Sequence, residues 1–182
     1  MRDESAQLSW TAYDSPLGTL TVVAGPSGIS NVRFPGRSPR LARAAQRRMP
    51  DVISQLSAYF AGERKTFELK LELRGDPLQE RVWGLLLEIP YGTTTTYGEL
   101  AARVDDSLYP VGLESYRRAR IVGAAVGRTP TPILVPCHRV IGSDGSLTGY
   151  GGGLQRKRAL LQLEGVAATG GATEAHRQLA LL

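Results

Sequence analysis

The stretch PTPILVPCHRVI, from Pro130 to Ile141, joins a stiff backbone to a potential nucleophile. Each of its three prolines fixes the backbone angle φ at about −65°, which makes the approach to Cys137 rigid. The apolar run 133–135 can anchor this proline-rich arm (residues 130–136) in a hydrophobic core. Cys137 is therefore expected at the end of a rigid, buried arm.

The side chains that follow the arm could form a catalytic group. A cysteine is nucleophilic as its thiolate, and a neighbouring imidazole can accept the proton. His138 is adjacent, but in an extended chain it would point away from Cys137, so a turn or a bridging water would be needed. A carboxylate beyond the imidazole would fix its tautomer, and Glu164 is the best candidate. The residues alone leave open another interpretation, a buried structural cysteine beside a surface histidine.

The composition excludes several classes of protein. A chain of 182 residues favours one domain or two small lobes that share a core, and 42% hydrophobic with 21% charged residues argues against wholesale disorder. No apolar run reaches the length of about 18 residues that a transmembrane helix needs, and the N-terminus lacks a signal-peptide pattern. We therefore expect a cytoplasmic protein without membrane contact. A single cysteine excludes an internal disulfide, and only two histidines accompany it, which argues against a zinc cluster.

Positive charge is concentrated in the second half of the chain. The stretch from Arg117 to Arg158 contains eight basic residues and one acid, although the net charge of the whole chain is only +5. Such a surface suits an anionic partner, but it could also be a solvated face. A second basic cluster, with the same two interpretations, consists of Arg37, Arg40, Arg43, Arg47 and Arg48.

The first 77 residues predict a small α/β lobe. Short β-rich runs separated by turn residues indicate a meander, and residues 35–50 are expected to be a basic linker or a short helix. A helix is predicted over 51–60, with Asp51 as its N-cap and with Ile53, Leu56 and Phe60 on one face. The predicted strands are residues 8–13, 20–24, 29–34 and 67–73.

Residues 78–165 show helical spacing and predict a second, mainly helical lobe. Thr96 and Glu99 fit a capping box that opens a helix running to about Val104, and Ser115 can cap an arginine-bearing helix to Val126. These two helices resemble a helix-turn-helix, although the loop 105–114 is long. Further helices are predicted from Leu78 to Ile89 and from Leu154 to Leu163. The tail 166–182 is expected to be frayed.

The motif PCHRV, residues 136–140, closely resembles the active-site motif of the O6-alkylguanine-DNA alkyltransferases. The resemblance continues in order from Leu78 to Gly165 through RVW, IPYG, TTYGELA, RIVG, GYGGGL and RALL, and more loosely through SPLG and LSAYFAGE in the N-terminal lobe. It implies an α/β (α+β) fold. The N-terminal lobe would be a small antiparallel β-sheet with a helix, ribonuclease H-like, and the C-terminal lobe would carry a helix-turn-helix and the active-site cysteine loop.

The family resemblance also implies an activity. Such a protein transfers the alkyl group of O6-alkylguanine, and of O4-alkylthymine, from DNA to its own cysteine, once and irreversibly, after flipping the base out of the duplex. The relay would run from Cys137 through a water to His138 and Glu164, with no cofactor and no metal. The alternatives are a non-catalytic protein that flags alkyl lesions and a cysteine hydrolase.

The DNA-binding residues implied by the resemblance lie on the arginine-bearing helix. Arg120 matches the arginine that the family inserts into the base stack from a helix docked in the minor groove. Small residues make this helix narrow enough for the groove, and its basic residues can neutralise DNA phosphates. The DNA-binding set is Arg117, Ala119, Arg120, Gly123 and Ala124. The expected partner is double-stranded DNA containing alkylated guanine, bound by a monomer that could cluster along DNA.

The pocket residues follow from the same resemblance. Tyr97 matches the tyrosine that hydrogen-bonds the flipped base and helps neutralise the leaving guanine. The carbonyls of Cys137 and Val140 match those that accept from the guanine amino group, while Arg139 braces the motif within the protein. The implied substrate pocket contains Val140, Tyr150, Gly151 and Gly152.

Three features depart from the family pattern. Thr129 stands where the family usually has an asparagine, and a hydroxyl replaces only part of an amide's hydrogen-bonding capacity. An insertion around Asp105–Leu113 separates Tyr97 from Arg120, and because its acids would repel phosphates it should either point away from DNA or limit which duplexes fit. The N-terminal lobe lacks the cysteine and histidine ligands of the zinc site found in some members.

Overall fold

A meander of three antiparallel strands forms most of the N-terminal sheet, as predicted. In this computed structural model, which describes residues 8–36 and 45–167, the strands are β1 (Ser9–Ser15), β2 (Gly18–Gly25) and β3 (Gly28–Arg33). The register pairs Ser9 with Ala24 and Ser15 with Gly18, and Gly18 closes the tight turn with φ 97°. The positive φ explains the glycine at this position.

The segment after β3 differs from the predicted basic linker. A short strand, β4 (Ala45–Gln46), pairs parallel to β1, so that the sheet order is β3-β2-β1-β4. Arg47 and Arg48 follow it and are exposed. The other three arginines of the second basic cluster lie outside the described residues.

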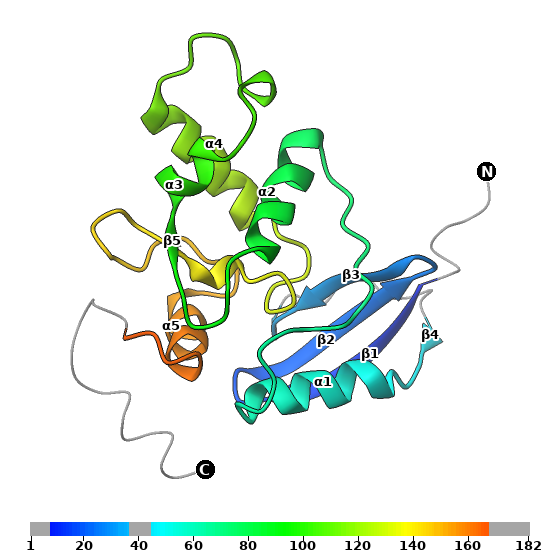
Figure 1. Cartoon of the computed structure of the whole chain (residues 1–182). Coiled ribbons are helices and arrows are strands. Elements are labelled where there is room, and N and C mark those ends of the chain that lie inside the picture. The colour runs from blue at the N-terminus through cyan, green and yellow to red at the C-terminus, as the bar shows by residue number, and fades with distance from the viewer. Residues whose placement is uncertain (1–7, 37–44, 168–182) are drawn as a thin grey trace, which may run out of the picture.

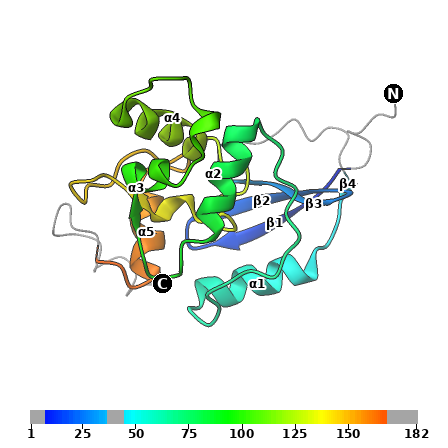
Figure 2. The same ribbon diagram turned by 45° about the horizontal axis from the view of Figure 1, so that its top comes forward.

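Helix α1 (Pro50–Phe60) lies along one face of the sheet (Figures 1 and 2). The predicted N-cap, Asp51, was wrong, because the helix begins one residue earlier, with Pro50 in the first turn and Met49 as N-cap without a side-chain bond. Proline suits this position because its missing N–H has no partner there. The predicted buried face was also wrong in part, since the buried residues are Val52, Leu56 and Tyr59 and not Ile53 and Phe60.

The predicted strand 67–73 is an extended segment with a single bridge to the sheet, between Leu71 and Ile29. The Ile29 N–H donates to the carbonyl of Lys70 at 2.8 Å, and the Glu72 N–H donates to the carbonyl of Ile29 at 2.8 Å. These bonds hold the segment beside β3 at one point only. From there the chain passes into α2 and the helical lobe (Figure 1).

Helices α2 (Pro77–Leu87) and α3 (Tyr97–Ala102) both begin with a capping box. Asp76 and Gln79 form the first, which was not predicted, whereas Thr96 and Glu99 form the second, which was. In each box the side chains satisfy backbone N–H groups that have no partner inside the helix. Helix α3 therefore starts at a fixed point, and Tyr97 is its first residue.

Helices α4 (Ser115–Gly127) and α5 (Leu154–Leu163) complete the helical lobe. The predicted cap of α4 was wrong, because Ser115 is its first residue and Glu114 is the N-cap, without a side-chain bond. Two short strands that were not predicted, β5 (Thr95–Thr96) and β6 (Val140–Ile141), pair in parallel. They attach the chain beyond Cys137 to the start of α3.

The proline-rich arm lies between two hydrophobic cores. Ile133 and Leu134 belong to the N-terminal core, whereas Val135 and Cys137 belong to the C-terminal core. Ile133 has φ 77°, in the left-handed region that a β-branched residue rarely adopts. Burial on both sides holds the arm in this conformation and fixes the position of Cys137. In the part of the chain that the structure describes, no helix is long and apolar enough to cross a membrane.

Candidate active site

Cys137 lies at the wall of a cavity of about 290 Å³ and is only 4% exposed. The cavity lies between the two lobes, because β3 and the glycine-rich loop 149–153 both contribute to it. Among the predicted pocket residues, Tyr150, Gly151 and Gly152 line this cavity, whereas Val140 does not. The other lining residues include Asn31, Arg33, Phe34, Arg128, Thr129, Pro130 and Pro132.

A short 3-10 helix, Cys137–Arg139, provides the turn that the sequence required. The Arg139 N–H donates to the carbonyl of Pro136 at 3.0 Å. The turn directs His138 into the interior, where it is fully buried. The alternative of a surface histidine is therefore wrong.

His138 and Glu164 are in direct contact, with 2.8 Å between Nε2 and Oε1. Nδ1, the other ring nitrogen, is buried and has no hydrogen-bond partner among the described residues. Burial lowers the pKa of His138, although the adjacent Glu164 carboxylate opposes this effect. The imidazole is thus neutral at physiological pH and can accept a proton.

The Glu164 carboxylate, just beyond α5, is the centre of a buried polar network. Arg139 donates to both carboxylate oxygens, at 2.8 and 2.9 Å, and its third nitrogen donates to the carbonyl of Ile89 at 2.6 Å. The Gly92 N–H donates to Oε2 at 3.3 Å. Burial alone would raise the pKa of Glu164, but hydrogen bonds from His138, Arg139 and Tyr59 lower it to about 2. Arg139 thus braces the motif as expected.

Tyr59 is a member of this network that sequence reasoning missed. It comes from α1 of the N-terminal lobe, and its hydroxyl donates to Oε1 of Glu164 at 2.7 Å. Its side chain is fully buried. At helical spacing beside Leu56 it resembles an ordinary core residue, so the sequence held no signal for this contact.

The Cys137 thiol is protonated in the resting protein. Burial raises its pKa to about 11, and hydrogen bonding with Thr129 and the positive charge of Lys157 oppose this increase only in part. The Thr129 hydroxyl also donates to the carbonyl of Val126 at 2.7 Å. Because a hydroxyl has a single proton, Thr129 can donate to the thiolate only by giving up this bond, whereas the asparagine expected at this position would have two N–H donors.

Lys157 is a second residue that sequence reasoning missed. Its side chain is fully buried, and Nζ donates to the carbonyls of Val140, Thr148 and Gly149 at 2.5, 2.6 and 3.3 Å. It thereby holds the loop before α5 against the strand that follows Cys137. Burial lowers the pKa of Lys157 to about 8. A lysine on a helix usually indicates a solvated face, which is why the sequence did not reveal it.

Tyr97 lies beside the cysteine turn but does not line the cavity. Its hydroxyl donates to the carbonyls of Thr148 and Gly149, at 3.1 and 3.3 Å. The ring packs against Gly123 of α4, where a Cβ atom would lie 3.5 Å from it. Tyr97 thus connects α3, α4 and the loop, and its predicted contact with a flipped base stays a prediction.

The predicted DNA-binding residues share the outer side of α4. Arg117, Arg120 and Ala124 are exposed, Ala119 and Gly123 are half-buried, and Val122 and Val126 face the core. The Arg117 guanidinium donates to the Tyr116 hydroxyl at 3.0 Å and lies 4.0 Å from Glu114. Arg120 has no side-chain partner in residues 8–36 and 45–167.

The insertion packs on the N-terminal end of α4 through its own polar groups. Asp106, in a 3-10 turn, forms an ion pair with Arg118, and Arg118 also lies over the ring of Tyr109. Asp105 accepts from the Ser107 N–H at 2.8 Å. The insertion's two aspartates are thus engaged within this region, and Val111 at its tip is fully exposed.

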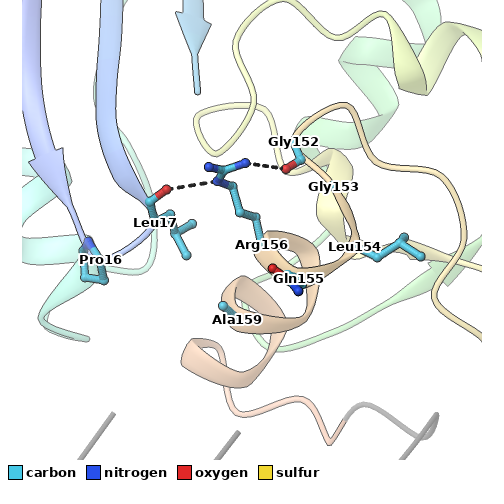
Figure 3. A pocket seen from close by; sticks show the side chains of 8 residues that line it. All are labelled: Pro16, Leu17, Gly152, Gly153, Leu154, Gln155, Arg156 and Ala159. Atoms are coloured by element: carbon cyan, nitrogen blue, oxygen red, sulfur yellow. Dashed lines mark hydrogen bonds between the residues drawn. The ribbon is translucent and has the colours of Figure 1, made fainter. Parts of the chain in front are cut away.

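Arg156 connects the lobes beside a second cavity, of about 550 Å³, between the β1–β2 turn and the start of α5 (Figure 3). It donates to the carbonyl of Leu17 at 3.0 Å and to that of Gly152 at 2.9 Å, and its guanidinium lies over the Phe34 ring. Gly152 and Phe34 also line the Cys137 cavity. Arg156, on α5, therefore connects the glycine-rich wall of that cavity to the N-terminal lobe. No group of three potential metal ligands occurs in the described part of the chain.

Two family models match this chain. One describes the DNA-binding domain of 6-O-methylguanine DNA methyltransferase and matches residues 77–166. The other describes the ribonuclease-like domain of the same protein and matches residues 8–73. Together they account for both lobes of the observed fold.

Relatives from mycobacteria are similar over nearly their whole length. The methylated-DNA–protein-cysteine methyltransferase of Mycobacterium tuberculosis is 46% identical over 161 residues, which cover 86% of this chain and 92% of the relative. The crystal structure of the O6-methylguanine methyltransferase from that organism has a TM-score of 0.74 at 43% identity, over 90% of this chain and 96% of that one. A crystal structure of Mycobacterium tuberculosis OGT in complex with DNA has a TM-score of 0.74 at 45% identity, covering 86% and 92%.

Proposed function

Because this chain belongs to the 6-O-methylguanine DNA methyltransferase family, we propose that Cys137 is the residue that accepts the methyl group. The chain is a methylated-DNA–protein-cysteine methyltransferase that repairs O6-methylguanine in DNA. Such a reaction needs a cysteine acceptor, and Cys137 is the only cysteine in the sequence. Its position in a cavity beside a buried histidine–glutamate pair is the observation that carries the proposal.

The buried relay supplies the proton acceptor for this step. Since burial holds the thiol protonated, His138 accepts its proton through a bridging water, and Glu164 stabilises the imidazolium that forms. The sulfur then bonds to the methyl carbon while the carbon–O6 bond breaks. The proton finally passes to the departing guanine.

The product is a thioether, which water does not readily cleave. Thiols do not displace it either, and the sequence has no second cysteine to accept another alkyl group, so each molecule acts once. The same displacement is open to O4-alkylthymine, whose alkyl carbon is bonded in the same way. No cofactor is needed, since both bonding changes occur between the cysteine and the alkylated base.

The O6 atom of a paired guanine is out of reach, so the base must be flipped out of the duplex. We assign the outer side of α4 to the minor groove. Arg120, which is exposed there, would enter the base stack, and the small side chains of Ala119, Gly123 and Ala124 would permit close approach. Arg117 would neutralise a phosphate once released from Glu114 and Tyr116.

The flipped base would enter the cavity beside Tyr150, Gly151 and Gly152. Tyr97 would reach its edge only after the tyrosine hydroxyl exchanges a loop carbonyl for the base. Val140 would contribute its carbonyl, which already accepts from Lys157 and retains a second lone pair.

We further propose that residues 1–77 form the N-terminal lobe and 78–165 the alkyltransferase lobe, because the two hydrophobic cores divide mainly along this line. The protein would act as a monomer in the cytoplasm, where its DNA substrate is accessible. Clustering along DNA is compatible with the basic surface of α4 and is an outcome that footprinting can detect.

A titration of repair tests this function. Increasing amounts of a duplex with one O6-methylguanine are incubated with a fixed amount of protein, and the lesions removed are counted. We expect removal to stop at one lesion per protein molecule, and Cys137→Ala to remove none. Tight lesion binding without removal would instead support a protein that only flags damage, and continued turnover would exclude irreversible transfer.

A further inference from the structure

Among the described residues of the N-terminal lobe, 8–36 and 45–77, one side-chain polar group is hydrogen-bonded to the buried relay, the hydroxyl of Tyr59. It lies 2.7 Å from Oε1 of Glu164, the same oxygen that His138 Nε2 meets at 2.8 Å. Tyr59 and Glu164 are 105 residues apart, and α1 is otherwise engaged with the sheet of its own lobe. This contact therefore joins the N-terminal lobe to the proton acceptor of the other lobe.

We infer that Tyr59 is a positioning residue for the relay, through which the ribonuclease-like lobe fixes the charge and orientation of Glu164. The inference rests on the relay proposed above, and it assigns this lobe a role in activating Cys137. Tyr59 does not line the Cys137 cavity, so it acts through Glu164 and not on the base.

The packing around Tyr59 fixes the position of its ring. The ring is fully buried and meets Phe60, Phe67 and Tyr91 at centroid distances of 5.4, 5.2 and 6.2 Å. A hydroxyl in such surroundings needs a partner, and a carboxylate is the strongest acceptor within reach. By donating this hydrogen bond, Tyr59 stabilises the ionised carboxylate and so helps to keep the pKa of Glu164 low.

The charges that face His138 determine in which direction its pKa changes when the Tyr59 hydroxyl is removed. Glu164 favours the imidazolium, whereas burial, Arg139 and Lys157 disfavour it. Facing Glu164 are His138, Arg139, Tyr59 and, at longer range, Tyr91 and Tyr150. Without the tyrosine hydroxyl, Glu164 becomes more basic and His138 holds a proton up to a higher pH. A protonated His138 cannot accept the proton of Cys137.

Tyr59→Phe tests this inference because it removes the hydroxyl and keeps the ring. The matched control is Tyr91→Phe, which removes a hydroxyl that donates to the carbonyl of Leu163 at 3.0 Å, beside the relay but not on the carboxylate. Two rates are measured from pH 5 to 9: methyl transfer from an O6-methylguanine duplex, and alkylation of Cys137 by iodoacetamide without DNA. Thermal unfolding shows that each variant is folded.

For Tyr59→Phe we expect methyl transfer to slow about tenfold at neutral pH, the loss typical of one hydrogen bond to a charged group. The acid limb of both pH profiles should move to higher pH, a shift that a purely structural role would not cause. Tyr91→Phe should keep the wild-type profile. Profiles of Tyr59→Phe that match wild type, or equal shifts in both variants, would overturn the inference. If the wild type itself transfers no methyl group, the proposed function fails, and the iodoacetamide profiles still decide the role of Tyr59.

Discussion

The two sides of Cys137 are built in opposite ways. On the interior side, His138, Arg139 and Glu164 are buried, and their polar groups are joined by hydrogen bonds of 2.8–2.9 Å. On the outer side of α4, Arg120 is exposed and has no side-chain partner in the part of the chain that the structure describes. The proposed proton acceptor is therefore assembled without DNA, whereas the proposed DNA-binding side still has a charged group available for DNA.

The largest difference between the two sides is expected in the free energy of unfolding, when one arginine is replaced on each side. Arg139→Met leaves the buried Glu164 carboxylate without its principal partner, which should destabilise the protein by about 3–5 kcal/mol. Arg120→Met removes an exposed side chain and should change stability by no more than about 0.5 kcal/mol. Urea unfolding measures both free energies. Equal losses would mean that the two sides do not differ as described.

Lowering the pH should remove the stability that the buried Glu164 carboxylate contributes on the interior side. The pKa of Glu164 is about 2 in the folded protein, below its value of about 4.3 in an unfolded chain. Its contribution, on the order of 3 kcal/mol, is therefore fully present above pH 4.3 and is lost as the pH falls toward 2. Stability measured from pH 6 to 2 should fall less steeply in Glu164→Gln than in wild type. Parallel curves would show that Glu164 is not held as a buried carboxylate.

Arg120→Ala tests the outer side through its substrate. Only the duplex requires base extrusion, so repair of a methylated duplex should slow about tenfold or more, while reaction with free O6-benzylguanine should change little. Single-turnover rates with the two substrates give the comparison. Equal losses on both would remove Arg120 from the extrusion step.

A smaller effect is expected at Arg117, whose guanidinium is already engaged by Tyr116 and Glu114. Arg117→Gln should weaken duplex binding a few-fold and reduce the slope of log affinity against log salt by about 0.9. Arg48→Gln, which removes an exposed charge from the N-terminal lobe, serves as the control and should leave the slope unchanged. A slope unaffected by Arg117→Gln would exclude a phosphate contact.

Local signals in the sequence predicted most of the fold. The turn residues of the meander, the Thr96–Glu99 capping box and helix 154–163 all depend on neighbours in the chain, and each is confirmed. The caps at Asp51 and Ser115 were wrong because α1 already begins at Pro50, which suits a first turn, and because Ser115 is itself the first residue of α4. The paired strands β5 and β6, of two residues each, are too short to give a periodic pattern.

The part of the candidate site that lies in or near the PCHRV motif could be predicted from the sequence. His138 and Glu164 are in contact as expected, because the motif and the last helix are close in sequence, whereas the link from Cys137 to His138 stays a prediction. Tyr59 and Lys157 could not be predicted. In the sequence, Tyr59 has the local pattern of an ordinary core tyrosine and Lys157 that of an ordinary surface lysine. Their roles depend on tertiary contacts, one with the other lobe and one with the loop before α5.

The most direct test of the central claim is to locate the transferred methyl group. The protein is incubated with a duplex containing O6-methylguanine, digested, and its peptides are weighed by mass spectrometry. The account predicts a gain of one methyl group on the peptide that contains Cys137 and no gain in Cys137→Ser. A methyl group on any other residue, or repair of the duplex with Cys137 unmodified, would contradict it.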